Sequence, residues 1–120
     1  MASTTGIEIG SDACILAGVR PGSGNALDVR ALTILSGSEW PSNDSARASL
    51  LRSIRRDEGL PRRAVVVSWG LAEALDHASV RASLRCVEDA GFTIESVISP
   101  PQALASVART RRRPNRYSRN

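Results

Sequence analysis

The chain opens with two apolar, strand-like segments that are separated only by a glycine turn. The first is Gly6–Ser11, which reads GIEIGS, and the second is Ala13–Val19. Strands joined this closely are expected to pair as an antiparallel hairpin. Glu8 lies in the middle of the first strand, and Gly10 and Ser11 begin the turn. This order can bring a carboxylate and a turn beside a phosphate, so Glu8, Gly10 and Ser11 are the candidate phosphate-contact residues. The structural alternative is that Gly10 only permits a tight turn and Glu8 is a partly exposed strand residue.

A third strand and a first helix follow the hairpin. Leu27–Leu35 alternates in polarity and predicts a strand that is half exposed at one end and buried at the other. Ser36–Asn43 contains the Trp-Pro pair and predicts a loop. Ala46–Asp57 has apolar residues at helical spacing, with Ser42 or Asp44 as its expected N-cap.

The second half of the chain continues with alternating strands and helices. Ala64–Val67 is short and wholly apolar, which is the pattern of a central strand covered on both faces. A second helix is expected to begin at Asp76 or Ser79 and to stop at Gly91. Phe92–Ile98 alternates in polarity and predicts a fifth strand.

The last predicted element is a helix that starts at Pro100-Pro101 and runs to Ala108. The expected order is therefore β-β-β-α-β-α-β-α. Three antiparallel strands followed by two crossover units make a mixed five-stranded sheet with helices on its faces. This α/β order matches the ribonuclease H-like fold, which also forms each half of the actin-like ATPases. We expect one domain over residues 1–108.

The basic charge of the chain is concentrated at its C-terminus. The net charge is +4 and all sixteen basic residues are arginine. The body up to Ala108 holds ten arginines and twelve acids, a net charge of −2. Residues 109–120 hold no acid and show no periodicity, so we expect a disordered arginine-rich tail. Such a tail either only solubilises the chain or binds nucleic acid or an acidic surface through counterion release. Its arginines are Arg109, Arg111, Arg112, Arg113, Arg116 and Arg119.

The cysteines and the lengths of the apolar runs bear on the cellular location of the protein. Cys14 and Cys86 lie inside a predicted strand and a predicted helix, and both are expected to be small buried residues rather than a disulfide or a reactive thiol. No signal peptide pattern opens the chain, and no apolar run approaches the ~20 residues that span a bilayer. These features favour a cytoplasmic protein without a membrane span.

Two segments resemble actin-like ATPases of the PilM and FtsA type. In that family, an opening strand ends in Asp-x-Gly and a hairpin cradles the nucleotide phosphate, as GIEIGSDACILAGV suggests here. The stretch VRASLRCVEDAGFTIESVISPPQALASVAR is similar to the PilM-type segment in which a helix ends in Ala-Gly-aromatic, a strand follows, and an alanine-rich helix comes next. The two segments cover about a third of the chain.

This chain departs from the family pattern at several points. Glu8 stands where the family has aspartate, and Ile15 stands where the hairpin often carries a basic residue. A second phosphate hairpin with its own aspartate and the adenosine-binding glycine pair are missing, and the length suffices for one half of such an ATPase. Hydrolysis requires charge neutralisation from both sides of the phosphates. We therefore expect a non-catalytic PilM-type binding module, with ATP and Mg²⁺ as weak ligands at most.

The resemblance implies a protein partner, since PilM-type proteins act in type IV pilus assembly and grip a short peptide from an inner-membrane protein. A groove beside the sheet or an exposed edge strand would receive that peptide. The chain could also be the weak nucleotide-binding half of a split ATPase.

The enzymatic alternative is a ribonuclease H-like nuclease of the YqgF-type Holliday-junction resolvases. Two-metal cleavage needs several converging carboxylates, and only Glu8, Glu73 and Asp76 are available for such a site. His77 is expected to be a solvated residue at a helix start, and Trp69 a core residue rather than a ligand contact.

Overall fold

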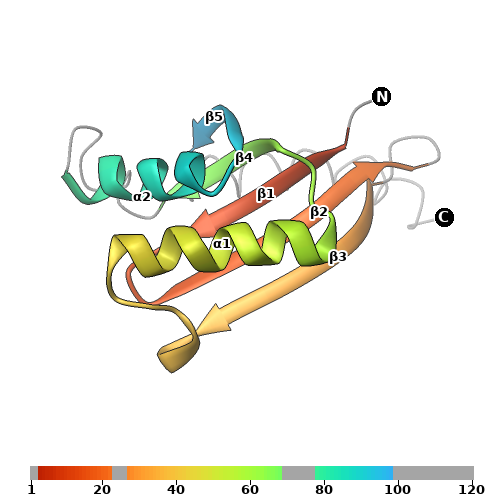
Figure 1. The fold of residues 1–120 in the computed structure, drawn as a ribbon. Coiled ribbons are helices and arrows are strands. Elements are labelled where there is room, and N and C mark those ends of the chain that lie inside the picture. The colour runs from red at the N-terminus through yellow and green to blue at the C-terminus, as the bar shows by residue number, and fades with distance from the viewer. Residues whose placement is uncertain (1–2, 23–26, 69–77, 99–120) are drawn as a thin grey trace, which may run out of the picture.

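Five strands form one mixed sheet in the spatial order β3-β2-β1-β4-β5 (Figure 1). This computed structural model describes residues 3–22, 27–68 and 78–98. The strands are β1 (Thr4–Ile9), β2 (Ala13–Pro21), β3 (Leu27–Ser36), β4 (Arg63–Ser68) and β5 (Thr93–Ile98). The helical elements are the short 3-10 helix η1 (Gly37–Glu39) and the helices α1 (Asp44–Glu58) and α2 (Ala78–Asp89).

The strand directions confirm the predicted meander and crossovers. β1 pairs antiparallel with β2, and β2 pairs antiparallel with β3. β4 lies parallel to β1 on its other side, and β5 lies parallel to β4. A hairpin can join antiparallel neighbours directly, whereas parallel neighbours need a crossover, and α1 and α2 lie in the two crossover connections.

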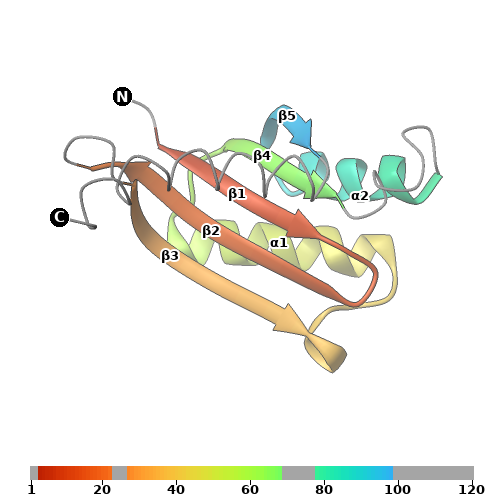
Figure 2. The same cartoon turned by 180° about the vertical axis from the view of Figure 1, so that it is seen from behind.

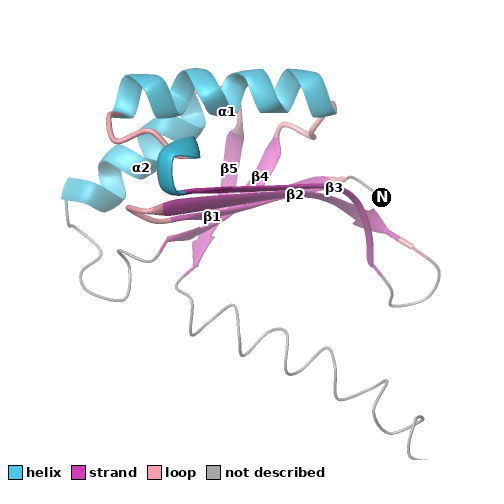
Figure 3. Ribbon diagram, turned by 90° about the horizontal axis from the view of Figure 1, so that it is seen from below, coloured by secondary structure: helices cyan, strands magenta, loops and turns pink. Residues whose placement is uncertain are grey.

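Both described helices cover the same face of the sheet (Figure 3). The core lies between these layers, and its members Ile7, Leu16, Leu51, Val66 and Val87 are at most 1% exposed. Successive strand residues point to opposite faces, so β1 and β4 each bury every second residue beneath the helices. The core is mainly aliphatic, in agreement with the low aromatic content. Figure 2 shows the opposite side, with β1, β2 and β3 in front of α1.

The ends of α1 follow the sequence, with one correction. The N-cap is Asn43, whose side chain accepts a hydrogen bond from the Ala46 N–H at 2.7 Å, so the prediction of Ser42 or Asp44 was wrong. Asp44 is instead the first helical residue, where its charge suits the positive end of the helix dipole. Gly59 adopts a φ of 62° and ends the helix, as a left-handed C-cap does.

The burial prediction for β3 was wrong at its apolar end. Leu32 and Ile34 are 60% and 58% exposed, and only Leu35 in that half is buried. Leu32 and Ile34 pair with β2 residues that point away from the helices, and this strand is the edge of the sheet. The Ser36–Asn43 loop also contains a turn of 3-10 helix, η1.

Several predicted elements lie outside the described residues. These are the third helix up to Ala108, the tail 109–120, and the helix start at Asp76. α2 is described from Ala78, and its stop at Gly91, with a φ of 98°, agrees with the expectation. Neither described helix is long and apolar enough to cross a bilayer.

Candidate functional site

Glu8 lies in the middle of β1 on the sheet face that α1 and α2 do not cover. Its neighbours on both sides, Ile7 and Ile9, point into the core, which directs Glu8 away from the helices. Across the sheet, Glu8 is in register with Ile15 of β2 and Val67 of β4. The half-buried carboxylate therefore has aliphatic residues as its partners on both adjacent strands.

Gly10 and Ser11 lie in the β1–β2 turn, directly after the strand that holds Glu8. The Gly10 N–H donates to the Ala13 carbonyl at 3.0 Å, which closes the turn. Ser11 and Asp12 lie exposed at its tip. Glu8, Gly10 and Ser11 thus lie at one end of the hairpin, where Ser11 is exposed.

Trp40 holds this turn in place, although the sequence predicts only a loop at that position. The indole is 5% exposed, and its Nε1 donates to the Gly10 carbonyl at 3.0 Å. The indole therefore occupies the core side of the turn, 30 residues along the chain from the group that it binds. An isolated Trp-Pro pair just before a helix cap is the only sequence signal for this contact.

Arg47 of α1 adds a second set of bonds to the same turn. Its guanidinium donates to the Ser11 carbonyl at 2.8 Å and, through Nε, to the Pro41 carbonyl at 2.6 Å. It also lies over the Trp40 ring, 4.9 Å from the ring centroid, which is a cation–π contact. The turn is therefore preorganised by two side chains that the sequence patterns did not single out.

The described residues offer no metal centre around Glu8. No group of three or more His, Cys, Asp or Glu side chains in these parts of the chain could hold an ion. Glu95 is two strands away in β5 and forms an ion pair with Arg63. Metal-dependent phosphodiester cleavage needs several carboxylates at one point.

Both cysteines are free and buried, as predicted. Burial raises the pKa of the Cys14 thiol to about 12, with Arg47 acting in the opposite direction and Glu8 adding to the rise. Burial also raises the pKa of Cys86, and the thiol donates to the Asp44 carbonyl at 3.4 Å. A thiol that stays protonated at neutral pH is a poor nucleophile, so these residues are structural.

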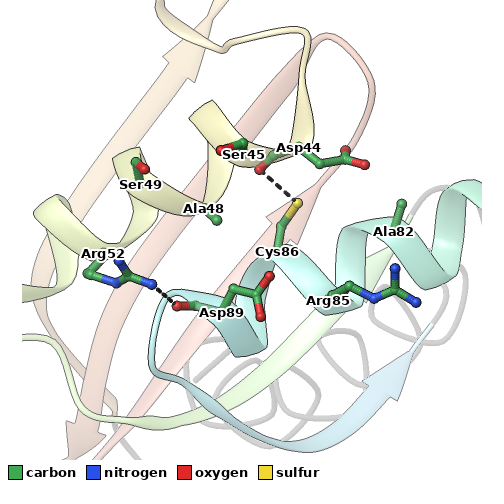
Figure 4. Close-up of a pocket in the computed structure, with 9 residues that line it drawn as sticks. All are labelled: Asp44, Ser45, Ala48, Ser49, Arg52, Ala82, Arg85, Cys86 and Asp89. Carbon is green, nitrogen blue, oxygen red and sulfur yellow. Dashed lines mark hydrogen bonds between the residues drawn. The ribbon is translucent and has the colours of Figure 1, made fainter.

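A groove of about 420 Å³ runs between α1 and α2, on the helix side of the molecule (Figure 4). It contains side chains of both charges, since Asp44 and Arg52 come from α1, and Arg85 and Asp89 from α2. Arg52 donates to the Asp89 carbonyl, which helps to close the C-terminal end of α2. No pattern in the sequence predicts this groove, because it arises from the packing of two helices.

Other predicted site residues lie outside the described parts of the chain. Trp69, Glu73, Asp76 and His77 belong to the stretch between β4 and α2. The six tail arginines, Arg109, Arg111, Arg112, Arg113, Arg116 and Arg119, follow β5. Their roles stay predictions.

Comparison with known proteins identifies the fold. No family model and no curated protein matches this chain. Solved structures do match. RuvC from Thermus thermophilus, in complex with a Holliday junction substrate, is 14% identical with a TM-score of 0.59, covering 89% of this chain and 72% of that one. The ethanolamine utilization protein EutJ from Carboxydothermus hydrogenoformans is 15% identical with a TM-score of 0.57, covering 84% of this chain and 38% of that one. The PPX-GPPA enzyme of Aquifex aeolicus is 17% identical with a TM-score of 0.55, covering 83% of this chain and 36% of that one.

These likenesses confirm the predicted ribonuclease H-like fold, shared by nuclease and actin-like types. At such low identity they show the fold alone. The chain spans 62% of the length of another Thermus thermophilus RuvC structure, at 17% identity and a TM-score of 0.51 over 82% of this chain. The chain spans little more than a third of the length of each of the two actin-like proteins.

Proposed function

We propose that this chain is a ribonuclease H-like domain that acts by binding a protein partner and not by catalysis. The observation that carries this proposal is the position of Glu8 between Ile15 and Val67, with no group of three or more metal-ligating side chains around it in the described residues. One carboxylate can attract a hydrated cation, but it cannot hold two metal ions in line with a scissile phosphate. Because it is itself an anion, it also cannot neutralise the charge of a nucleoside triphosphate, which needs cations or N–H donors on both sides of the phosphates.

The partner that we propose is a short peptide of an inner-membrane protein, in a PilM-type role in type IV pilus assembly. The support for this choice is the sequence resemblance in the hairpin and in the segment from α2 through β5. The sheet ends in two edge strands, β3 and β5, and a peptide can add to an edge strand through main-chain hydrogen bonds.

Binding is tested by isothermal titration calorimetry, in which the purified chain is titrated with the cytoplasmic tail peptide of a pilus-assembly membrane protein. We expect saturable binding that a scrambled peptide of the same composition does not show. Absence of binding, by protein whose circular dichroism confirms folding, would contradict the pilus role.

Nucleotide binding is the second candidate, favoured by the actin-like neighbours and by the preorganised turn next to Glu8. It predicts a thermal shift with Mg-ATP that Glu8→Ala abolishes. Asp12→Asn is the matched control, since Asp12 is an exposed acid at the tip of the same turn. A thermal shift that depends on Glu8 but not on Asp12 would support the hypothesis that the chain is the nucleotide-binding half of a split ATPase.

The resolvase alternative is favoured by the likeness to RuvC. It needs further carboxylates near Glu8, and Glu73 and Asp76, outside the described residues, are the candidates. Cleavage of a four-way DNA junction with Mg²⁺, lost in Glu8→Gln, would establish the nuclease and overturn the binding role.

A further inference from the structure

The sheet face opposite α1 and α2 is apolar over β1, β2 and β4, and no described helix lies on it (Figure 3). We call this surface the open face. β4 is apolar on both of its faces, which is the pattern of a strand covered on both sides, yet the described helices cover one side alone. The aliphatic side chains of β2 and β4 on the open face are only partly buried, and they are Ile15, Ala17, Val65 and Val67.

The stretch after β5 is well placed to cover this face. Residues 23–26 join β2 directly to β3, and residues 69–77 lead into α2, which lies on the other side of the sheet. Residues 99–120 follow β5 and lead to no further described element. They begin with the predicted helix 101–108.

The predicted helix 101–108 is amphipathic. Leu104, Val107 and Ala108 fall on one side of it at helical spacing, whereas Gln102 and Ser106 fall on the opposite side. A helix with one apolar side is stable when that side is buried against another apolar surface. The open face is such a surface.

The strand register places the start of this helix at one end of the open face. Ile98, the last residue of β5, is level with Val67 and Glu8. The strands end just beyond this level, so a helix that stays on the apolar surface has to run back toward Thr4. Eight helical residues rise about 12 Å, and the strand from Glu8 back to Thr4 spans about 13 Å. Helix and open face therefore match in length.

We propose that residues 101–108 of this chain pack as a helix on the open face, across β4, β1 and β2. A helix is about 10 Å wide and neighbouring strands are about 4.8 Å apart, so its width spans these three strands. Helical side chains tilt toward the N-terminus of their helix, so Leu104 lies over Val67 and Ile15. Ala108 lies one turn further along, over Gly6.

Gly6 allows the close approach that this packing requires. It lies on the open face, between Ala17 of β2 and Val65 of β4. A side chain at Gly6 would have one described atom within 4 Å, the Ala17 carbonyl oxygen at 3.9 Å. The missing side chain thus leaves a dip between the two neighbouring strands, and a residue as small as Ala108 fits over it.

The direction of the helix also suits Glu8. A helix that starts at the level of Ile98 brings its unpaired N–H groups and the positive end of its dipole toward the Glu8 carboxylate. A helix running the other way would bring its negative end there. Glu8, whose neighbours Ile15 and Val67 are aliphatic, therefore gains a favourable contact. This inference does not rest on the proposed function, and it leaves both edge strands open to a peptide.

The proposal is tested by disulfide formation in the full chain. Val67→Cys combined with Leu104→Cys should form an intramolecular disulfide under mild oxidation, because side chains in contact lie within disulfide reach. Val67→Cys combined with Ser106→Cys is the matched control and should not, since Ser106 lies on the opposite side of the helix. A disulfide between two copies would show that a second copy covers the face. That outcome, no disulfide in either variant, or equal disulfide formation in both, overturns the proposal.

A second pair of variants tests the same contact without crosslinking. Leu104→Asp should lower the urea midpoint of the full chain and increase its binding of the apolar dye ANS, because the open face loses its cover. Ser106→Asp adds the same charge on the polar side of the helix and should leave both measurements unchanged. Equal effects of the two substitutions, or no effect of Leu104→Asp, would overturn the proposal.

Discussion

The contact between Trp40 and the β1–β2 turn makes a quantitative prediction about stability. In Trp40→Phe, the apolar ring remains but the Nε1 donor is lost, which leaves the Gly10 carbonyl without this bond. An unpaired, partly buried carbonyl costs about 1–3 kcal/mol. The cation–π contact with Arg47, 4.9 Å from the ring centroid, contributes roughly 0.5–1 kcal/mol and is weaker with Phe. We expect a total loss of about 2–3 kcal/mol, a large fraction of a domain's stability.

The loss is measured by urea unfolding followed by far-UV circular dichroism, because Trp69 would complicate a fluorescence signal. Arg47→Met keeps the aliphatic part of the side chain and removes the guanidinium bonds to Ser11 and Pro41. A double-mutant cycle between positions 40 and 47 should give a coupling of at least about 0.5 kcal/mol, as expected for residues in contact. A loss below about 0.5 kcal/mol in Trp40→Phe, or additive effects in the cycle, would refute the reasoning that these side chains hold the turn together.

Two further predictions concern the core. Leu51→Ala should reduce the free energy of unfolding by about 2–5 kcal/mol, because Leu51 is fully buried; a loss typical of an exposed helix residue would contradict its place in the core. Burial raises the pKa of the Cys14 thiol from 9.0 to about 12 in the folded chain. Between these two pH values the thiol ionises only in the unfolded chain, which favours unfolding. The free energy of unfolding should therefore be constant below pH 9 and fall by about 1.4 kcal/mol per pH unit between pH 9 and 12. Urea unfolding from pH 8 to 11 should show this slope in the natural chain and a shallower one in Cys14→Ala, and equal slopes would argue against a buried thiol.

The sheet and its topology could be predicted because local patterns determine them. Short apolar runs and alternating polarity located the strands, and glycine at position 59 marked the end of α1 through a conformation that few other residues adopt. The N-cap was misplaced by one residue, since Ser42, Asn43 and Asp44 are all good caps and only the geometry selects Asn43.

The surroundings of the candidate site could not be predicted in the same way. Trp40 and Arg47 reach the hairpin turn from 30 or more residues away, and no periodicity encodes such contacts. Leu32 and Ile34 look like core residues by composition, but whether a helix covers their face depends on the whole sheet. The irregularity beside Gly18, which aligns Val29 with them, is likewise a property of strand pairing.

The central claim, that Glu8 alone cannot support catalysis, is tested most directly by single-turnover assays with the chain in large excess. Radiolabelled ATP and a labelled four-way DNA junction, each with Mg²⁺ or Mn²⁺, are followed for product over hours. We expect no product above the background without protein. Product that forms with the natural chain, disappears in Glu8→Gln and persists in Asp12→Asn would contradict the claim.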